Sequence, residues 1–306
     1  MTRSRRIISA YIALTVLITV GGYASLARRS PMPIGEVQGR WSVLLDERFD
    51  GADLDGRTWN AGEPWETSGR ADGEAWLPVP ATREQVGVDN GILSLHARRR
   101  DNLPEAKAFT SAHLNTRGNF ALEEGTTTYT EAKLNLPAGN GLLPQFWLLG
   151  KGDNSTGEGW PLTGEVDLIE MANANTGEFA NPYFSVWFPR DVYTSPPGTF
   201  LNATHVTHPD SFSRRPELFA GWHTWGLYRS PERMDLYIDG KKQFTFQPGK
   251  TYGGESIPLP KMLFTDQMHL RVSLGVGGDW AGQNWDADKL EEGTLGVDHV
   301  RVWRLD

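Results

Sequence analysis

The sequence predicts an all-β fold, either a sandwich or a barrel. The 306-residue chain contains 34 Gly and 19 Pro, which favour frequent turns, together with 12 Trp, 13 Phe and 8 Tyr, which favour strands. From Trp41 onward, short alternating or β-branched runs recur, bounded by turn residues. No stretch has the periodicity of a long amphipathic helix. Since all-β folds of more than about 200 residues often form one domain, a single large domain accommodates these runs.

The first half of the chain predicts four strands. Residues 42–46 form an apolar opening run, and residues 91–97 alternate apolar with other side chains after an Asn90–Gly91 turn. Residues 126–136 are rich in β-branched Thr, and residues 145–149 form a short apolar run. These runs have the length and composition expected of strands.

The second half predicts five more strands. An Asp239–Gly240 pair separates two alternating runs, which is a strong signal for a hairpin. The other three runs are apolar with interspersed polar residues, and the last of them ends near the C-terminus. The expected strands lie at residues 164–171, 234–238, 243–246, 269–276 and 297–303.

Charge and cysteine content exclude several classes of function. The net charge of −8 argues against a nucleic-acid partner, which requires a basic face. The chain has no Cys, so disulfides, thiolate metal sites and cysteine nucleophiles are excluded.

The N-terminus indicates export. Residues 1–6 are basic, residues 7–27 carry no charge and are largely apolar, and Arg28–Arg29 follows. This helix-forming segment fits a cleaved signal peptide, and its length also fits an uncleaved membrane anchor. A buried core helix is the third reading. The first two place the bulk of the chain outside the cytoplasm. We therefore assign residues 1–30 to a signal peptide or anchor, 31–40 to a linker and 41–306 to one domain, which we expect to be monomeric.

Three carboxylates lie within an apolar strand at residues 164–171. Glu165 and Asp167 project to one face, because side chains alternate along a strand, whereas Glu170 is out of phase by one residue. A single bulge at Leu168–Ile169 would return Glu170 to the face of the other two. Burying an unpaired carboxylate costs roughly several kcal/mol of folding free energy. The row of acids therefore indicates a chemical role.

Two carboxyl groups flanking a glycosidic bond are the minimum equipment for its hydrolysis. A third carboxylate between them can hold a proton and separate the pKa values of the outer pair. A retaining mechanism requires the outer groups to approach to about 5–5.5 Å, which a curved sheet and long Glu side chains would permit. Two alternatives remain: a calcium site built from alternating oxygen ligands, and a solvated strand face.

Two aromatic side chains near the carboxylates are candidates for sugar stacking. Sugars present C–H faces to indole rings, so Trp often lines glycan sites. Trp147 lies on the preceding predicted strand, where core packing is the competing role. Trp160 lies in a Gly-rich stretch upstream of Glu165, where exposure is more natural.

The run Glu165-Val-Asp167-Leu-Ile-Glu170 resembles the signature of glycoside hydrolase family 16 in its bulged form. Other segments resemble motifs of the same family in the same order: DERFDG at 46–51, FTSAHLNTRG at 109–118, FWLLG at 146–150, GVGGDW at 275–280 and VDHVRV at 297–302. The resemblance implies a curved β-jelly-roll sandwich, similar to concanavalin A, with a concave glycan cleft. It also implies Glu165 as nucleophile, Glu170 as acid/base and Asp167 as the assisting carboxylate.

The resemblance further implies substrate-binding and metal-binding residues. Trp147, Trp160, Trp187 and Trp280 are the expected sugar contacts, although Trp187 stands where many members place a His. The family often binds a structural calcium ion, for which Glu47, Gly91 and Asp298 would occupy the ligand positions. Catalysis itself is expected to need no cofactor.

The leading functional hypothesis is a retaining endo-glycosidase that hydrolyses β-1,3- or β-1,3/1,4-glucan. One alternative is transglycosylation, in which a sugar hydroxyl replaces water, as suits remodelling of a surface glycan. A second alternative is a non-catalytic glycan-binding protein on the same fold. Such proteins typically lose the catalytic Glu residues, and the presence of Glu165 and Glu170 favours an enzyme.

Overall fold

The structure is a computed structural model of the chain. It describes residues 34, 37–62, 76–78, 85–100, 109–152, 160–171, 183–190, 203–207, 215–277 and 289–306. The predicted N-terminal apolar helix lies outside this part of the chain. Within the described residues, no helix has the length and apolar character needed to cross a membrane.

The described residues form strands and two short helical turns, the 3-10 turn η4 (Pro216–Phe219) and α2 (Met262–Thr265). The strands are β1 (Trp41–Glu47), β2 (Asn60–Ala61), β3 (Trp76–Pro78), β4 (Val86–Asp89), β5 (Ile92–Arg99), β6 (Phe109–Ser111), β7 (His113–Asn115), β8 (Thr128–Asn135), β9 (Leu142–Gly150), β10 (Glu165–Glu170), β11 (Tyr183–Pro189), β12 (Ala203–Thr207), β13 (Trp222–Ser230), β14 (Arg233–Ile238), β15 (Lys241–Phe246), β16 (Met268–Val276) and β17 (Gly293–Leu305).

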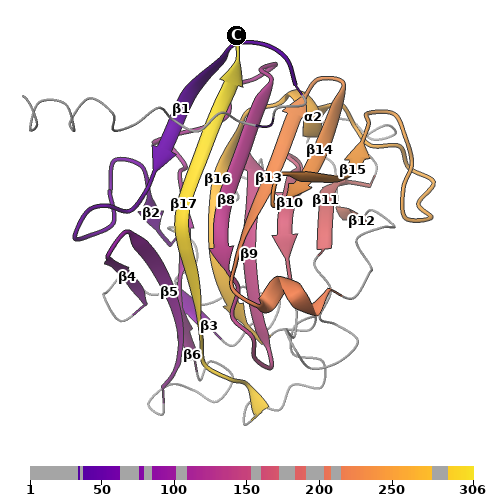
Figure 1. Cartoon of the computed structure of the whole chain (residues 1–306). Coiled ribbons are helices and arrows are strands. Elements are labelled where there is room, and N and C mark those ends of the chain that lie inside the picture. Colours follow the sequence, from indigo (N-terminus) through magenta and orange to yellow (C-terminus); the bar gives the residue numbers. More distant parts are fainter. Residues whose placement is uncertain are drawn as a thin grey trace, which may run out of the picture.

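The strands form two stacked sheets, almost entirely antiparallel (Figure 1). Sheet A has the order β15-β14-β13-β8-β17-β5-β6-β3, with β1 paired to β17 and β4 paired to β5. Sheet B has the order β12-β11-β10-β9-β16-β7-β2. Consecutive strands often lie in different sheets, as expected of a jelly roll. The predicted all-β jelly-roll sandwich is therefore confirmed.

The central strands of sheet B are buried along their whole length. Every residue of β9, β10 and β16 is buried. One face contributes apolar side chains such as Phe146, Val166 and Val272 to the core between the sheets. The opposite face carries polar and charged side chains, including the three carboxylates, and is called the carboxylate face below. Two buried faces of opposite chemistry indicate a core on one side and a site on the other.

The predicted bulge in β10 is confirmed. Along β9, Asp167 pairs with Trp147, but Ile169 pairs with Phe146, so the register shifts between Asp167 and Ile169. The register with β11 shifts in the same place. Leu168 and Ile169 both belong to the core cluster and have no exposed surface. One additional residue is thus placed in the core, and Glu170 returns to the carboxylate face.

A second apolar cluster lies on the outer face of sheet A. Its buried members, Tyr129, Tyr228, Tyr237 and Trp303, are covered in part by Ile34, Val37 and Trp41. The described residues of the predicted linker therefore pack on the sheet that does not carry the carboxylates. β1 begins at Trp41, where the domain was expected to begin, and the division into segments stays a prediction.

Candidate active site

Glu165, Asp167 and Glu170 form one buried cluster on the carboxylate face. Their exposed fractions are 9%, 0% and 7%, and one oxygen from each lies within 4.8 Å of the others. The burial excludes a solvated strand face. The proximity follows from the bulge in β10, because an unbroken two-residue period would direct Glu170 into the core.

Asp167 is the most deeply buried of the three. Its Oδ2 accepts a hydrogen bond of 2.7 Å from the Ser185 hydroxyl on β11. Desolvation raises the pKa of Asp167 well above 3.8, and the charges of Glu170 and Glu165 raise it further. A hydrogen bond with Glu165 also raises this pKa, while the bond from Ser185 opposes the shift. Burial and like charge therefore favour the protonated form of Asp167.

Glu170 is held from two neighbouring strands. The Gln145 amide on β9 donates a 2.6 Å hydrogen bond to Glu170 Oε1. The Ser185 hydroxyl lies 3.3 Å from Glu170 Oε2 as a weaker second partner. Hydrogen-bond donors therefore face these carboxylate oxygens, which suits the binding and transfer of protons better than ligation of a cation.

A buried arginine lies on the same face beyond Trp147. Arg271 on β16 donates hydrogen bonds of 3.1 Å to His269 and 3.2 Å to His113. Its guanidinium lies 4.8 Å from the Trp147 ring centroid, so it stacks on the indole. Burial, followed by the charges of Arg271 and Arg117, lowers the pKa of His269 to about 2. His269 is therefore a neutral hydrogen-bond acceptor.

The polar lining of this face was not predicted residue by residue, although the sequence carried a signal. His269, Arg271 and Ser273 alternate with Leu270, Val272 and Leu274 in a strand that is buried throughout. Such alternation indicates a polar face opposite the core face. Gln145 and Ser185 gave no comparable local signal, because their partners lie on other strands.

The structure separates the predicted sugar-binding tryptophans into two settings. Trp147 is 5% exposed, and its indole N–H donates to Ser273, so packing and positioning dominate its contacts. Trp187 is the cross-strand partner of Glu165. Trp160 is 42% exposed, and its ring centroid lies 5.8 Å from that of Trp187. This aromatic pair beside Glu165, of which Trp160 is exposed and Trp187 half-buried, can stack on a sugar. Trp280 lies outside the described residues.

A cavity of about 730 Å³ opens beside His269 and the ends of β7 and β9. Its lining includes Arg117, Lys151 and Gly152 as well as His269. Leu149 pairs with both Glu165 and His269, so His269 at the edge of the cavity lies two strands, or about 10 Å, from Glu165.

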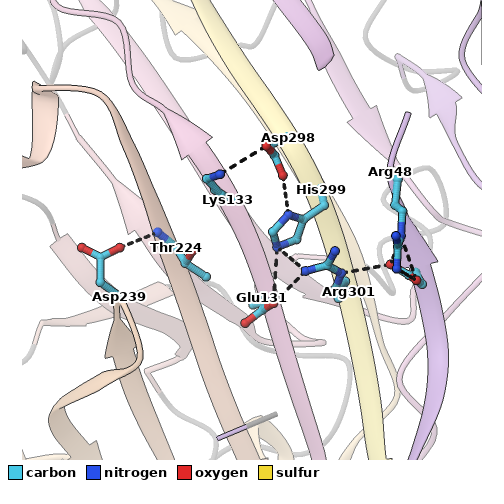
Figure 2. Close-up of polar contacts among 9 residues, drawn as sticks. Arg48, Glu131, Lys133, Thr224, Asp239, Asp298, His299 and Arg301 are labelled. Carbon is cyan, nitrogen blue, oxygen red and sulfur yellow. Dashed lines mark hydrogen bonds and ion pairs between the residues drawn. The ribbon is translucent and has the colours of Figure 1, made fainter. Parts of the chain in front are cut away.

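Asp298 is one of the expected calcium ligands, but its contacts do not suit a cation (Figure 2). Its two carboxylate oxygens bond to Lys133 at 3.3 Å and to His299 at 2.6 Å. Glu47 Oε1 accepts a 2.9 Å hydrogen bond from the Phe49 backbone N–H, and Gly91 lies in the turn between β4 and β5. A calcium ion would have to displace the partners of Asp298. Calcium at these positions stays a prediction, and no catalytic step uses it.

The geometry supports acid/base and nucleophilic chemistry on an acetal. The short separation of the outer carboxyl groups leaves no space for a water molecule on the opposite side of a substrate. It fits a carboxylate that attacks carbon next to an acid that protonates the leaving oxygen. The neutral Asp167 lies between them.

Comparison with known proteins agrees with this geometry. The model of glycosyl hydrolases family 16 matches residues 77–290. A beta-glucanase of Rhodothermus marinus is 26% identical over 267 residues, which are 86% of this chain and 85% of the relative. A beta-1,3-glucan-binding protein of Penaeus monodon is 27% identical over 245 residues, with 64% of this chain and 63% of the relative covered.

Solved structures share the fold. The laminarinase from Rhodothermus marinus has a TM-score of 0.67 and 24% identity, with 88% of this chain and all of that chain covered. The endo-beta-1,3-glucanase from Pyrococcus furiosus has a TM-score of 0.64 and 23% identity, with 90% of this chain and 99% of that chain covered.

Proposed function

The chain belongs to glycosyl hydrolases family 16, and from this premise we propose that it is a retaining, endo-acting hydrolase of β-1,3- or mixed β-1,3/1,4-glucan. One observation carries the proposal. One oxygen from each of Glu165, Asp167 and Glu170 lies within 4.8 Å of the others, which fits the separation of about 5–5.5 Å in retaining enzymes. Inverting enzymes require about 6.5–9.5 Å between their carboxyl groups.

The reaction proceeds in two steps. Glu165 attacks the anomeric carbon and forms a glycosyl ester, while Glu170 donates its proton to the departing glycosidic oxygen. Glu170 then accepts a proton from water, and the resulting hydroxyl attacks the same carbon and releases Glu165. Asp167, which keeps its proton, donates a hydrogen bond to Glu165 and avoids a third adjacent negative charge.

The substrate assignment is supported by the relatives and by the pair of Trp160 and Trp187. The beta-glucanase, the glucan-binding protein and the laminarinase reported above are all named for β-glucans or their hydrolysis. Trp160 and Trp187 offer a stacking surface next to Glu165, and the cavity beside His269 extends the site. A site open at both ends would accept an internal bond of a polymer.

Two alternative functions, transglycosylation and glucan binding without turnover, can be tested on the same site. Transglycosylation uses the same glycosyl ester with a sugar hydroxyl in place of water, so product sizing distinguishes it from hydrolysis. The Penaeus monodon relative is named for glucan binding. In this chain the buried Glu165, Asp167 and Glu170 favour turnover over binding alone.

We also propose an extracytoplasmic location, with the N-terminal segment as signal peptide or membrane anchor. The support is the basic residues 1–6 followed by the uncharged residues 7–27. Fractionation of cells that express the full chain tests this proposal, and recovery of the protein only from cytosol would contradict it.

Glu165→Gln is the direct test of the enzymatic function. We expect turnover of β-glucan to fall at least about 10³-fold while glucan binding persists, because the nucleophile is lost and the aromatic surface is unchanged. Reducing-end release measures turnover, and affinity electrophoresis measures binding. Glu123→Gln, an exposed acid remote from the site, is the matched control. Equal turnover in Glu165→Gln and the control would end the proposal.

A further inference from the structure

Gln145 is a buried amide that connects two strands to the acid/base. It is 6% exposed on the carboxylate face, at the position of β9 that pairs with Glu170. Its Nε2 donates to Glu170 Oε1 at 2.6 Å, and its Oε1 accepts a 2.8 Å hydrogen bond from Ser273 on β16. Both ends of the amide are therefore bonded.

Trp147 adds a further donor to this chain of hydrogen bonds. The indole N–H, which can only donate, lies 3.2 Å from Ser273 Oγ. Ser273 accepts from Trp147 and donates its single proton to Gln145 Oε1. Because the amide oxygen accepts from Ser273, the NH₂ group faces Glu170 Oε1, which accepts from it. The carboxyl group is thus held by a donor whose other end is bonded to Ser273.

We infer that Gln145 is a positioning residue that holds Glu170 in place as acid/base through both steps of the reaction. This inference rests on the proposed function. An amide N–H can donate to a carboxylate and equally to the carbonyl oxygen of a carboxylic acid. An amide does not titrate in the working range, so it cannot take the proton that Glu170 must transfer. A donor of this kind stabilises the charged state more, because hydrogen bonds to charged groups are stronger.

In the part of the chain that the structure describes, several other titratable groups lie on the same face as Glu170. Glu165 and Asp167 lie on its own strand, and Tyr183 is its partner on β11. Arg271 on β16 and His113 on β7 lie farther along the rows that contain Trp147 and Ser273. These groups are unchanged in a variant of Gln145, so a change in the pH profile reports the lost amide.

Gln145→Met tests the inference, because Met has a similar length and no donor. We expect the basic limb of the profile of kcat/KM against pH to move upward by about one pH unit, as loss of a hydrogen bond to a charged group predicts. We also expect kcat/KM on β-glucan to fall about 10-fold, with little loss on a 2,4-dinitrophenyl laminaribioside. That leaving group departs without a proton, so its cleavage does not depend on the acid.

Ser273→Ala is the second variant, because it removes the hydrogen bond that orients Gln145. It should shift the basic limb in the same direction by a smaller amount. Gln85→Met is the matched control, since Gln85 is a buried amide whose Nε2 donates to Thr110, not to a catalytic carboxylate. Its pH profile should match that of the parent protein. Thermal melting of all variants separates a local effect from loss of fold.

The outcomes separate this inference from the proposed function. If the parent protein cleaves no β-glucan or laminaribioside, the proposed function fails before any variant is compared. If the parent is active and Gln145→Met keeps both its basic limb and its activity ratio between the two substrates, only the positioning role is overturned. A loss of equal size on both substrates would also overturn it.

Discussion

At the scale of residues, environment assigns three similar carboxyl groups to different tasks. Asp167 has no exposed surface and lies between two acids, so burial and like charge keep it protonated. Glu170 receives a short hydrogen bond from an amide. Glu165 faces the aromatic pair through its cross-strand partner Trp187. The central acid thus keeps its proton, while in the proposed mechanism Glu165 bonds to the sugar and Glu170 transfers a proton.

Asp167→Asn tests the protonated state of the central acid. Because the pKa of Asp167 is raised in the folded chain, its contribution to stability is present below about pH 3.8 and is lost as the pH rises toward the folded value. An Asn cannot ionise, so the melting temperature of the variant relative to the parent should increase by about 2–4 °C between pH 4 and pH 7. Thermal melts at several pH values measure this difference.

Asp235→Asn is the control for that experiment. Asp235 is also fully buried, but it accepts hydrogen bonds from Arg233 and Thr245. Its replacement should lower the melting temperature at pH 7, because a charged partner is left without its carboxylate. An Asp167→Asn variant that behaved in the same way as this control would show that Asp167 is ionised.

At the scale of elements, the bulge in β10 connects the sequence to the chemistry. Its existence was predictable, because the Glu-x-Asp-x-x-Glu spacing breaks the two-residue period and both intervening residues are apolar. The structure places Leu168 and Ile169 in the core. The bulge therefore places both apolar residues in the core and directs Glu170 to the carboxylate face.

Two single-residue deletions test the bulge. Deletion of Ile169 leaves Glu-Val-Asp-Leu-Glu, which alternates regularly and keeps all three acids on one face. Deletion of Val166 makes the first Glu and the Asp adjacent, so one of them must face the core. We expect measurable glucan hydrolysis, within about 10³-fold of the parent, only from the first variant. Reducing-end assays on folded protein measure this, and the reverse order of activities would contradict the account.

Other elements were less accessible to prediction. The nine expected strands all overlap strands of the structure, but other strands were not predicted, among them β2, β3, β4, β11, β12 and β13. In β13 the buried side of the strand includes Arg229, whose guanidinium donates to the carbonyls of Leu263 and Asp266 around α2. A buried arginine interrupts the apolar pattern by which a strand is recognised. Its partners lie more than 30 residues away, so no local pattern reveals them.

At the scale of the whole molecule, one face of sheet B packs in the core and the other carries the carboxylates. The apolar face could be predicted, since it follows from periodicity, and so could the carboxylate row. The hydrogen-bond chain from Trp147 through Ser273 and Gln145 to Glu170 could not. It spans three strands, and its geometry depends on their register. The sequence therefore predicts the row of acids, whereas the register of the sheet determines which side chains hold them.

The stereochemistry of the first product is the most direct test of the central claim, that a bulge brings Glu165 and Glu170 close enough for a covalent intermediate. Proton NMR of a β-1,3-glucan during the first minutes of cleavage distinguishes the anomers of the new reducing ends before they equilibrate. We expect the β-anomer to appear first, because two inversions restore the configuration. Appearance of the α-anomer first would contradict it.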